Sequence, residues 1–191
     1  MQRLEDSYLA SDDPLHQCGF TGGSVRWRQE REPILEAIED DGDLLDACCA
    51  NGYLLECLVA WGRIRGREIT PFGIDQGARL IALACARLPG LADHFQVTNA
   101  WDWCPPRRFR YVYALWDCVP EDYLHEFVGR LLVRTVAAGG RLILGAYGNR
   151  SRGEQPFDVG VYLRAAGYRV RGTACGGDPI VSRFAWIDLE S

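Results

Sequence analysis

The sequence predicts a three-layer α/β/α domain, in which helices cover both faces of a doubly wound, mostly parallel sheet of seven strands. Two observations favour this class. Short apolar runs alternate five times with helix-like stretches, an order typical of parallel strands joined by crossover helices. Two more strand-like runs then follow, and the loop between them is too short for a helix, so we expect them to form an antiparallel hairpin.

The amino-terminal part, residues 1–40, is expected to form a segment and a helix that precede the sheet domain of residues 41–191, the two making one globular unit. The helix is predicted by the apolar residues Trp27, Ile34, Leu35 and Ile38. Ser24 is a candidate N-cap. Pro33 is expected to limit or kink this helix, because proline has no N–H to donate.

Strands and helices then alternate along the chain. The predicted parallel strands are residues 43–46, 69–75, 95–97, 111–115 and 141–146. The predicted helices are residues 53–61, 81–88, 124–135 and 157–165. Gly139 and Gly140 are expected to form a turn before the fifth strand. The hairpin of residues 168–174 and 183–189 is expected to give the sheet one reversed edge strand.

Composition excludes several function classes. The chain has 191 residues, of which 48% are hydrophobic, enough for one domain with an ample core. Lysine is absent, so all 21 basic residues are arginine, which excludes a pyridoxal Schiff base and a Walker-type phosphate loop. The formal net charge of -5 disfavours general nucleic-acid binding, which needs a positive face.

Other sequence features point to a compact intracellular protein. The eight cysteines are scattered and form no C-x-x-C pair, so buried free thiols are expected rather than disulfides. No His, Cys and Asp spacing indicates a metal site. No apolar run approaches the length of a membrane span, and the polar, acidic start does not read as a signal peptide. A cytoplasmic location without membrane association is therefore expected, and the sequence predicts no oligomeric state.

The stretch DLLDACCANGY, residues 43–53, is the most informative in the chain. A short apolar strand leads through Asp46 into small residues and then into a helix that begins at Tyr53. Cys48, Ala50 and Gly52 would form the tight turn between strand and helix. This order is typical of a nucleotide-type cofactor site, because the helix amino end faces the ligand.

This stretch resembles a known family. Asp46 to Gly52, followed by Phe72-Gly73-Ile74-Asp75 and Asn99-Ala100-Trp101, is similar to the class I S-adenosylmethionine (SAM) dependent methyltransferases over roughly residues 43–147. The family's first loop usually reads acid-x-Gly-x-Gly-x-Gly, and here only Gly52 keeps a glycine. The resemblance implies a Rossmann-like sheet, the cofactor SAM, the product S-adenosylhomocysteine (SAH), and transfer of a methyl group.

Two cofactors compete for the first loop. A nicotinamide site would prefer G-x-G-x-x-G, whose third glycine position is Tyr53 here. Asp46 suits SAM better, because a carboxylate pairs with the cofactor's ammonium group, and its alternative role is to cap the helix. Asp75 would hold two ribose hydroxyls in either cofactor, or it merely forms a turn.

The resemblance implies further contacts. Asn99, with Asp102 as an alternative, would meet the adenine amino group, and Ala100 and Trp101 would flank the ring; Asn99 could instead stabilise a turn and Trp101 could be core. The cofactor-binding set is then Asp46, Ala47, Cys48, Ala50, Asn51, Gly52, Asp75, Gln76, Asn99, Ala100, Trp101 and Leu115. The candidate lid or substrate residues are Tyr8, Phe20, Trp27, Arg31 and Tyr147. Arg31 is a candidate for the methionine carboxylate. Instead of a lid, the aromatic residues of this segment could form a cluster that packs against the sheet.

The predicted function is in-line methyl transfer from SAM to a small-molecule acceptor. A degenerate SAM-binding protein and a NAD-dependent oxidoreductase remain as alternatives. No catalytic residue is assigned, because the sulfonium already activates the methyl group and a general base is optional; His16, Tyr147 and Asp117 are candidates. The chain lacks the Asn-Pro-Pro-Tyr segment typical of family members that methylate nucleobases or glutamine, which disfavours those substrates.

Overall fold

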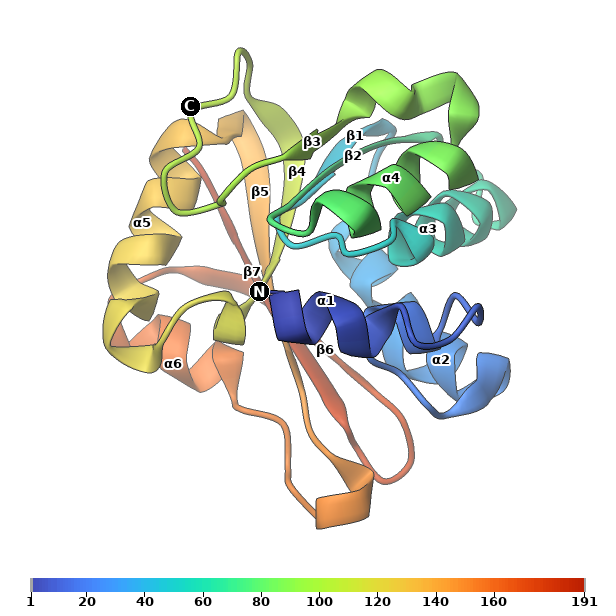
Figure 1. The fold of residues 1–191 in the computed structure, drawn as a ribbon. Helices are drawn as coiled ribbons and strands as arrows, with labels where there is room; N and C mark the ends of the chain where they lie inside the picture. Colours follow the sequence, from blue (N-terminus) through green and yellow to red (C-terminus); the bar gives the residue numbers. More distant parts are fainter. Residues whose placement is uncertain (1, 191) are drawn as a thin grey trace.

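One sheet of seven strands organises the chain in the computed structural model, which describes residues 2–190 (Figure 1). The strands are β1 (Gly42–Asp46), β2 (Ile69–Asp75), β3 (Phe95–Val97), β4 (Phe109–Leu115), β5 (Val136–Tyr147), β6 (Val170–Gly176) and β7 (Ser182–Asp188). Their order is β3-β2-β1-β4-β5-β7-β6, with β1 to β5 parallel and β7 antiparallel to both neighbours. The predicted sheet with its C-terminal hairpin is confirmed.

Two details of the predicted sheet were wrong. The reversed strand is β7, which lies between β5 and β6 and not at the edge. Its residues are mostly buried, whereas those of β6 alternate with exposed positions, as an edge strand does. Gly139 and Gly140 do not end a helix in a turn but lie inside β5, where Gly139 takes a φ of 67° and the pairing with β4 shifts register. The glycines make a bulge in a longer strand.

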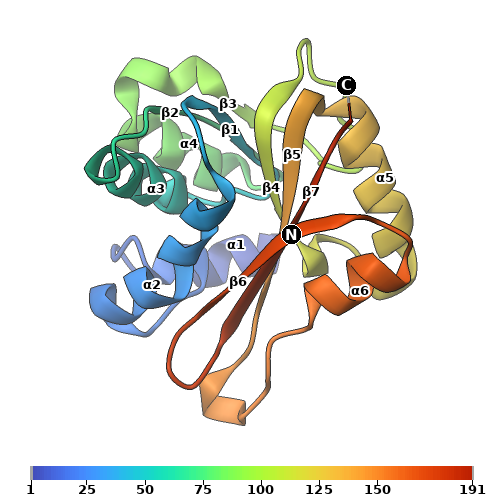
Figure 2. The same ribbon diagram turned by 180° about the vertical axis from the view of Figure 1, so that it is seen from behind.

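Helices cover both faces of the sheet, as Figures 1 and 2 show from opposite sides. The α-helices are α1 (Gln2–Tyr8), α2 (Gly23–Arg31), α3 (Tyr53–Ile64), α4 (Ala78–Arg87), α5 (Leu124–Arg134) and α6 (Val159–Ala165). The short 3-10 helices are η1 (His16–Cys18), η2 (Glu32–Ala37), η3 (Pro89–His94), η4 (Trp116–Cys118), η5 (Glu121–Tyr123) and η6 (Arg150–Arg152). Apolar residues of α2, α3 and α4 pack on one face, and those of α5 and α6 pack on the other. The three-layer prediction is confirmed.

The amino-terminal part differs from its prediction in two ways. Helix α1 was not predicted, because its seven mostly polar residues show no apolar face. Ser24 is not the cap of α2, because it lies inside the helix. The helix starts at Gly23, its cap position is Gly22, and no side chain caps it. Pro33 acts as expected, because α2 ends at Arg31 and the chain continues as η2.

All eight cysteines are free, but only Cys49 and Cys57 are buried, so the expectation of buried thiols holds in part. Within residues 2–190, no helix combines the length and the apolar character needed to cross a bilayer.

Candidate functional site

A cavity of about 420 Å³ opens at the carboxyl ends of β1, β2 and β4, under the amino-terminal segment. Its size lies within the range of small-molecule sites in proteins. The end of β5 and the turns after β1, β2, β3 and β4 supply its walls, and α1 and α2 supply its cover. The sheet order reverses beside β1, since β2 lies on one side and β4 on the other, and open α/β sheets bind ligands at this point.

The turn after β1 is built by backbone bonds to the neighbouring strands. The Ala47 N–H donates to the Tyr113 carbonyl at 2.9 Å, and the Cys49 N–H donates to the Ile74 carbonyl at 3.0 Å. Gly52 then starts α3 with a φ of 72°, and a Cβ there would lie 2.9 Å from the Cβ of Ala84. Only glycine fits this position without strain, which explains why this one glycine of the pattern is present.

Ala50 also has a left-handed backbone, with a φ of 47°. Its N–H donates to Asp75 Oδ2 at 2.9 Å, and the Gly77 N–H donates to Asp75 Oδ1 at 2.8 Å. The Asp75 carboxylate therefore ties the turn after β1 to the start of α4. Because each carboxylate oxygen has two lone pairs, both oxygens retain acceptor capacity toward the cavity that they line.

The buried acid of the site is Asp46, which is 3% exposed. Its Oδ1 accepts the Cys48 N–H at 3.2 Å. The pKa of Asp46 is raised to about 7, chiefly by burial and to a smaller extent by the charge of Asp75, whereas the bond from Cys48 opposes the shift. A cationic partner in the cavity would favour the ionised form of this carboxyl.

A guanidinium stands at the β5 side of the cavity. Arg31 lies over the rings of Trp27, Phe20 and Tyr147, at 3.9, 4.3 and 4.4 Å from the ring centroids. It donates to Glu30 Oε2 at 3.3 Å, but Arg26 and Arg150 also approach that carboxylate, at 3.2 and 3.4 Å. One carboxylate thus serves three guanidinium groups, which leaves positive charge for a ligand.

Two tyrosines stand beside this guanidinium. The Tyr113 and Tyr147 hydroxyls are 3.1 Å apart, and both residues line the cavity. Burial raises the pKa of both, so both stay protonated at neutral pH; one hydroxyl donates to the other, and the second can donate to a ligand. Guanidinium and hydroxyl donors together favour a carboxylate at this end of the cavity.

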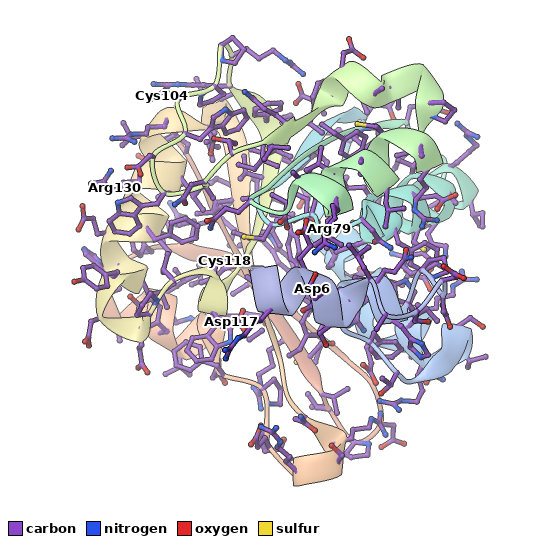
Figure 3. All side chains as sticks on the ribbon, in the orientation of Figure 1. Asp6, Arg79, Cys104, Asp117, Cys118 and Arg130 are labelled. Atoms are coloured by element: carbon purple, nitrogen blue, oxygen red, sulfur yellow. The ribbon has the colours of Figure 1, made fainter. Side chains whose placement is uncertain are left out.

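Helix α1 covers the opposite side of the cavity, where Glu5 and Tyr8 line it. Arg79 of α4 holds this helix: its backbone N–H donates to Glu5 Oε1 at 2.8 Å, its Nε donates to Glu5 Oε2 at 2.9 Å, and its side chain also donates to Asp6. Figure 3 labels Arg79 and Asp6 at this contact. The amino-terminal helix is therefore attached to the element that follows Asp75.

Most of the residues predicted from the sequence meet at this cavity. Those that line it are Tyr8, Trp27, Arg31, Asp46, Ala47, Cys48, Ala50, Asp75, Gln76, Ala100, Leu115 and Tyr147. Phe20, Asn51, Gly52, Asn99 and Trp101 are not among its lining residues.

These five residues have other contacts. Asn51 is buried and donates to the Pro14 carbonyl and to Gln17, so it ties the turn to the amino-terminal segment. Asn99 is exposed, and its Oδ1 accepts the Trp101 N–H at 2.9 Å. Trp101 stacks on Phe127 with ring centroids 6.3 Å apart. Phe20 packs edge-on against Trp27, and Gly52 provides the left-handed backbone that precedes α3.

Several lining residues were not predicted for the site. They are Glu5, Cys18, Cys49, Leu54, Leu80, Thr98, Tyr113 and Cys118. A period-two signal could have found two of them, because Thr98 lies two positions from Ala100 and Tyr113 two positions from Leu115. Glu5 and Cys18 come from distant segments and carry no such signal.

Of the three candidate general bases, Asp117 and Tyr147 line the cavity. His16 is exposed and pairs with the Ser11 hydroxyl at 3.0 Å. No group of three or more His, Cys, Asp and Glu residues within the described chain has the arrangement of a metal site.

Models of protein families do not match this chain, and neither do curated proteins. Solved structures do. The N-methyltransferase NodS from Bradyrhizobium japonicum WM9, in complex with SAH, is 15% identical with a TM-score of 0.66 and covers 100% of this chain and 98% of its own. Magnesium protoporphyrin IX methyltransferase ChlM from Synechocystis PCC 6803, with bound SAM, is 13% identical with a TM-score of 0.63, and the match covers 99% of this chain and 96% of ChlM. The cyclase SpnF is 15% identical with a TM-score of 0.60, and the match covers 84% of this chain and 79% of SpnF. At these identities the likeness shows the fold, so the fold expected from the resemblance is confirmed.

Proposed function

We propose that this protein is a SAM-dependent methyltransferase that acts on a small-molecule acceptor. The observation that carries the proposal is the order of charges along the cavity: Asp75 at the end of β2, Asp46 at the end of β1, and Arg31 toward β5. SAM has a ribose diol, an ammonium and a carboxylate in a comparable order. When bound, it supplies a methyl group already activated by the sulfonium.

In this proposal Asp75 accepts both ribose hydroxyls with the lone pairs that Ala50 and Gly77 leave free. The adenine lies against the wall made by Gln76, Thr98 and Ala100. This wall replaces the predicted contacts of Asn99 and Trp101, which lie outside the cavity.

The methionine end follows the turn after β1. Asp46 binds the ammonium group, which would stabilise the carboxylate that burial otherwise disfavours. Arg31, with the hydroxyls of Tyr113 and Tyr147 beside it, binds the carboxylate. Leu115, at the end of β4, forms the floor below the reacting methyl group.

The amino-terminal residues 1–40 serve as the lid of the cofactor domain, residues 41–191. Helix α1, η1 and α2 each supply lining residues, namely Tyr8, Cys18, Trp27 and Arg31. Their task is to exclude water and to fix the acceptor in line with the carbon–sulfur bond.

A nicotinamide cofactor fits less well. Its pyrophosphate would lie near the Asp46 and Asp75 carboxylates, and like charges repel. A protein that binds SAM without transferring its methyl group is the second candidate. The loss of two pattern glycines favours it, and the cyclase SpnF shows that a protein of this fold can have another activity. Cys48 and Ala50 nevertheless line the cavity and do not fill it.

Calorimetric titration with SAM, SAH and NADH tests the proposal. We expect SAM and SAH to bind and NADH not to bind. Turnover against small amine, hydroxyl and carboxyl acceptors, detected as SAH release, then separates an enzyme from a binding protein. Binding of NADH alone would refute the cofactor assignment, and tight SAM binding without turnover on any acceptor would favour the second candidate.

A further inference from the structure

Asp117 is an acidic residue of the cavity that has no cationic partner among the described residues. It lies in η4, directly after β4, and lines the cavity (Figure 3). Within residues 2–190 its carboxylate forms no ion pair and accepts no hydrogen bond from another residue. Although the residue is exposed to solvent, surrounding protein removes enough water to raise the pKa of its carboxyl.

Each of the other carboxylates of the cavity has at least one hydrogen-bond partner in the protein. Glu5 binds Arg79, Asp46 accepts the Cys48 N–H, and Asp75 accepts two backbone N–H groups. Arg31 is the one cationic lining residue within the described chain, and it pairs with Glu30. A ligand group is therefore the remaining source of positive charge for Asp117.

The position of Asp117 relates it to the acceptor rather than to the adenosine. It follows Leu115, the proposed floor below the methyl group, by two residues. Its neighbour Cys118 lines the cavity together with Cys48, so η4 and the turn after β1 border the same space. Tyr8 of helix α1 lines the same cavity as Asp117, so Asp117 faces the space that the amino-terminal segment covers.

We infer that the acceptor is a small primary or secondary amine whose ammonium group binds the Asp117 carboxylate. This inference rests on the proposed function. The carboxylate accepts a charge-assisted hydrogen bond from the ammonium and then its proton, which frees the nitrogen lone pair. The nitrogen–carbon bond forms as the carbon–sulfur bond breaks, the electron pair of that bond stays on sulfur, and the proton leaves to solvent. An alcohol would leave Asp117 without a cation, and a carboxylate acceptor would be repelled by it.

The test measures binding to the SAH-saturated protein by calorimetry at pH 7. The probes are butylamine, benzylamine and tryptamine, each compared with the alcohol of the same skeleton, namely butanol, benzyl alcohol and tryptophol. Three variants are compared with the wild type: Asp117→Asn, Asp117→Glu and, as a matched control, Asp122→Asn, which removes an exposed carboxylate of η5 outside the cavity.

We expect at least one amine to bind about tenfold more tightly than its alcohol, the effect of one charge-assisted hydrogen bond. Asp117→Asn should abolish this preference without changing the Kd for SAH, Asp117→Glu should retain part of it, and Asp122→Asn should retain all of it. A protein that binds SAH but prefers no amine, or that keeps the preference in Asp117→Asn, overturns the inference and leaves the proposed function standing. A protein that does not bind SAH overturns the proposed function, and the inference with it.

Discussion

Replacing Asp75 with alanine separates the structural role of this carboxylate from its proposed role in binding ribose. The side chain accepts the Ala50 N–H at 2.9 Å and the Gly77 N–H at 2.8 Å, so its removal loosens the turn after β1 and the start of α4 together. It also removes the acceptor pair that we assign to the ribose diol.

Both effects have an expected size. A hydrogen bond to a charged group contributes about 1.5–3 kcal/mol, and the lower end applies here because water in the cavity can reach the freed N–H groups. Two such bonds make the expected loss in the free energy of unfolding about 3 kcal/mol. The lost ribose contact should weaken SAH binding at least about tenfold, on the order of 1.4 kcal/mol.

Urea unfolding measures the first quantity, and calorimetric titration with SAH measures the second. Asp75→Asn, which keeps one acceptor oxygen, should recover about half of the lost stability but not the affinity. Asp93→Ala removes an exposed carboxylate of η3 outside the cavity and should change neither quantity. A folded Asp75→Ala protein that binds SAH within twofold of the wild type would refute the ribose assignment.

Three further perturbations test other parts of the site. Burial raises the pKa of Asp46 to about 7, so the folded chain holds a proton that the unfolded chain releases above pH 4. The free energy of unfolding should therefore fall from about pH 4 to about pH 7, by at most about 1.4 kcal/mol per pH unit. Urea unfolding at several pH values measures this slope, and Asp46→Asn should remove it. If the wild type and the variant show the same pH dependence, the raised pKa is contradicted. Arg79→Ala should weaken SAH binding several-fold by freeing α1, with little change in stability, whereas removal of the exposed Arg63 should leave the Kd for SAH unchanged. Ala50→Gly relieves a left-handed backbone and should stabilise the chain by up to about 1 kcal/mol in thermal unfolding; a lower Tm would show that this φ carries no strain.

The strands were the best-predicted elements, because each is an apolar run ended by a turn residue or an acid. The prediction matches β2 and β3 residue for residue, and it differs by two residues at the start of β4. Helix α1 could not be predicted in this way. A helix of seven residues is unstable alone, and the bonds from Arg79 that hold it come from a residue more than seventy positions away.

The wall of the cavity made by Gln76, Thr98 and Ala100 shows how a small geometric rule changes a site assignment. The Thr98 N–H donates to the Asp75 carbonyl at 2.9 Å, so the extended pairing of β3 continues beyond its last residue. Successive side chains of extended backbone face opposite ways, so Thr98 faces the cavity and Asn99 faces away; a turn then begins at Ala100, which also lines the cavity. The sequence shows an amide near the expected place but not the register that turns it outward.

The turn after β1 shows how a glycine pattern can be lost while the backbone shape it serves is kept. A left-handed residue other than glycine costs about 1–2 kcal/mol. At Ala50 the hydrogen bond to the Asp75 carboxylate offsets a cost of this size, because bonds to charged groups contribute about 1.5–3 kcal/mol. Gly52, where a Cβ would meet Ala84, has no comparable compensation and stays glycine. Sequence patterns record the side chains of this turn, whereas a ligand meets its backbone, so the turn can remain competent to bind after most of its pattern has changed.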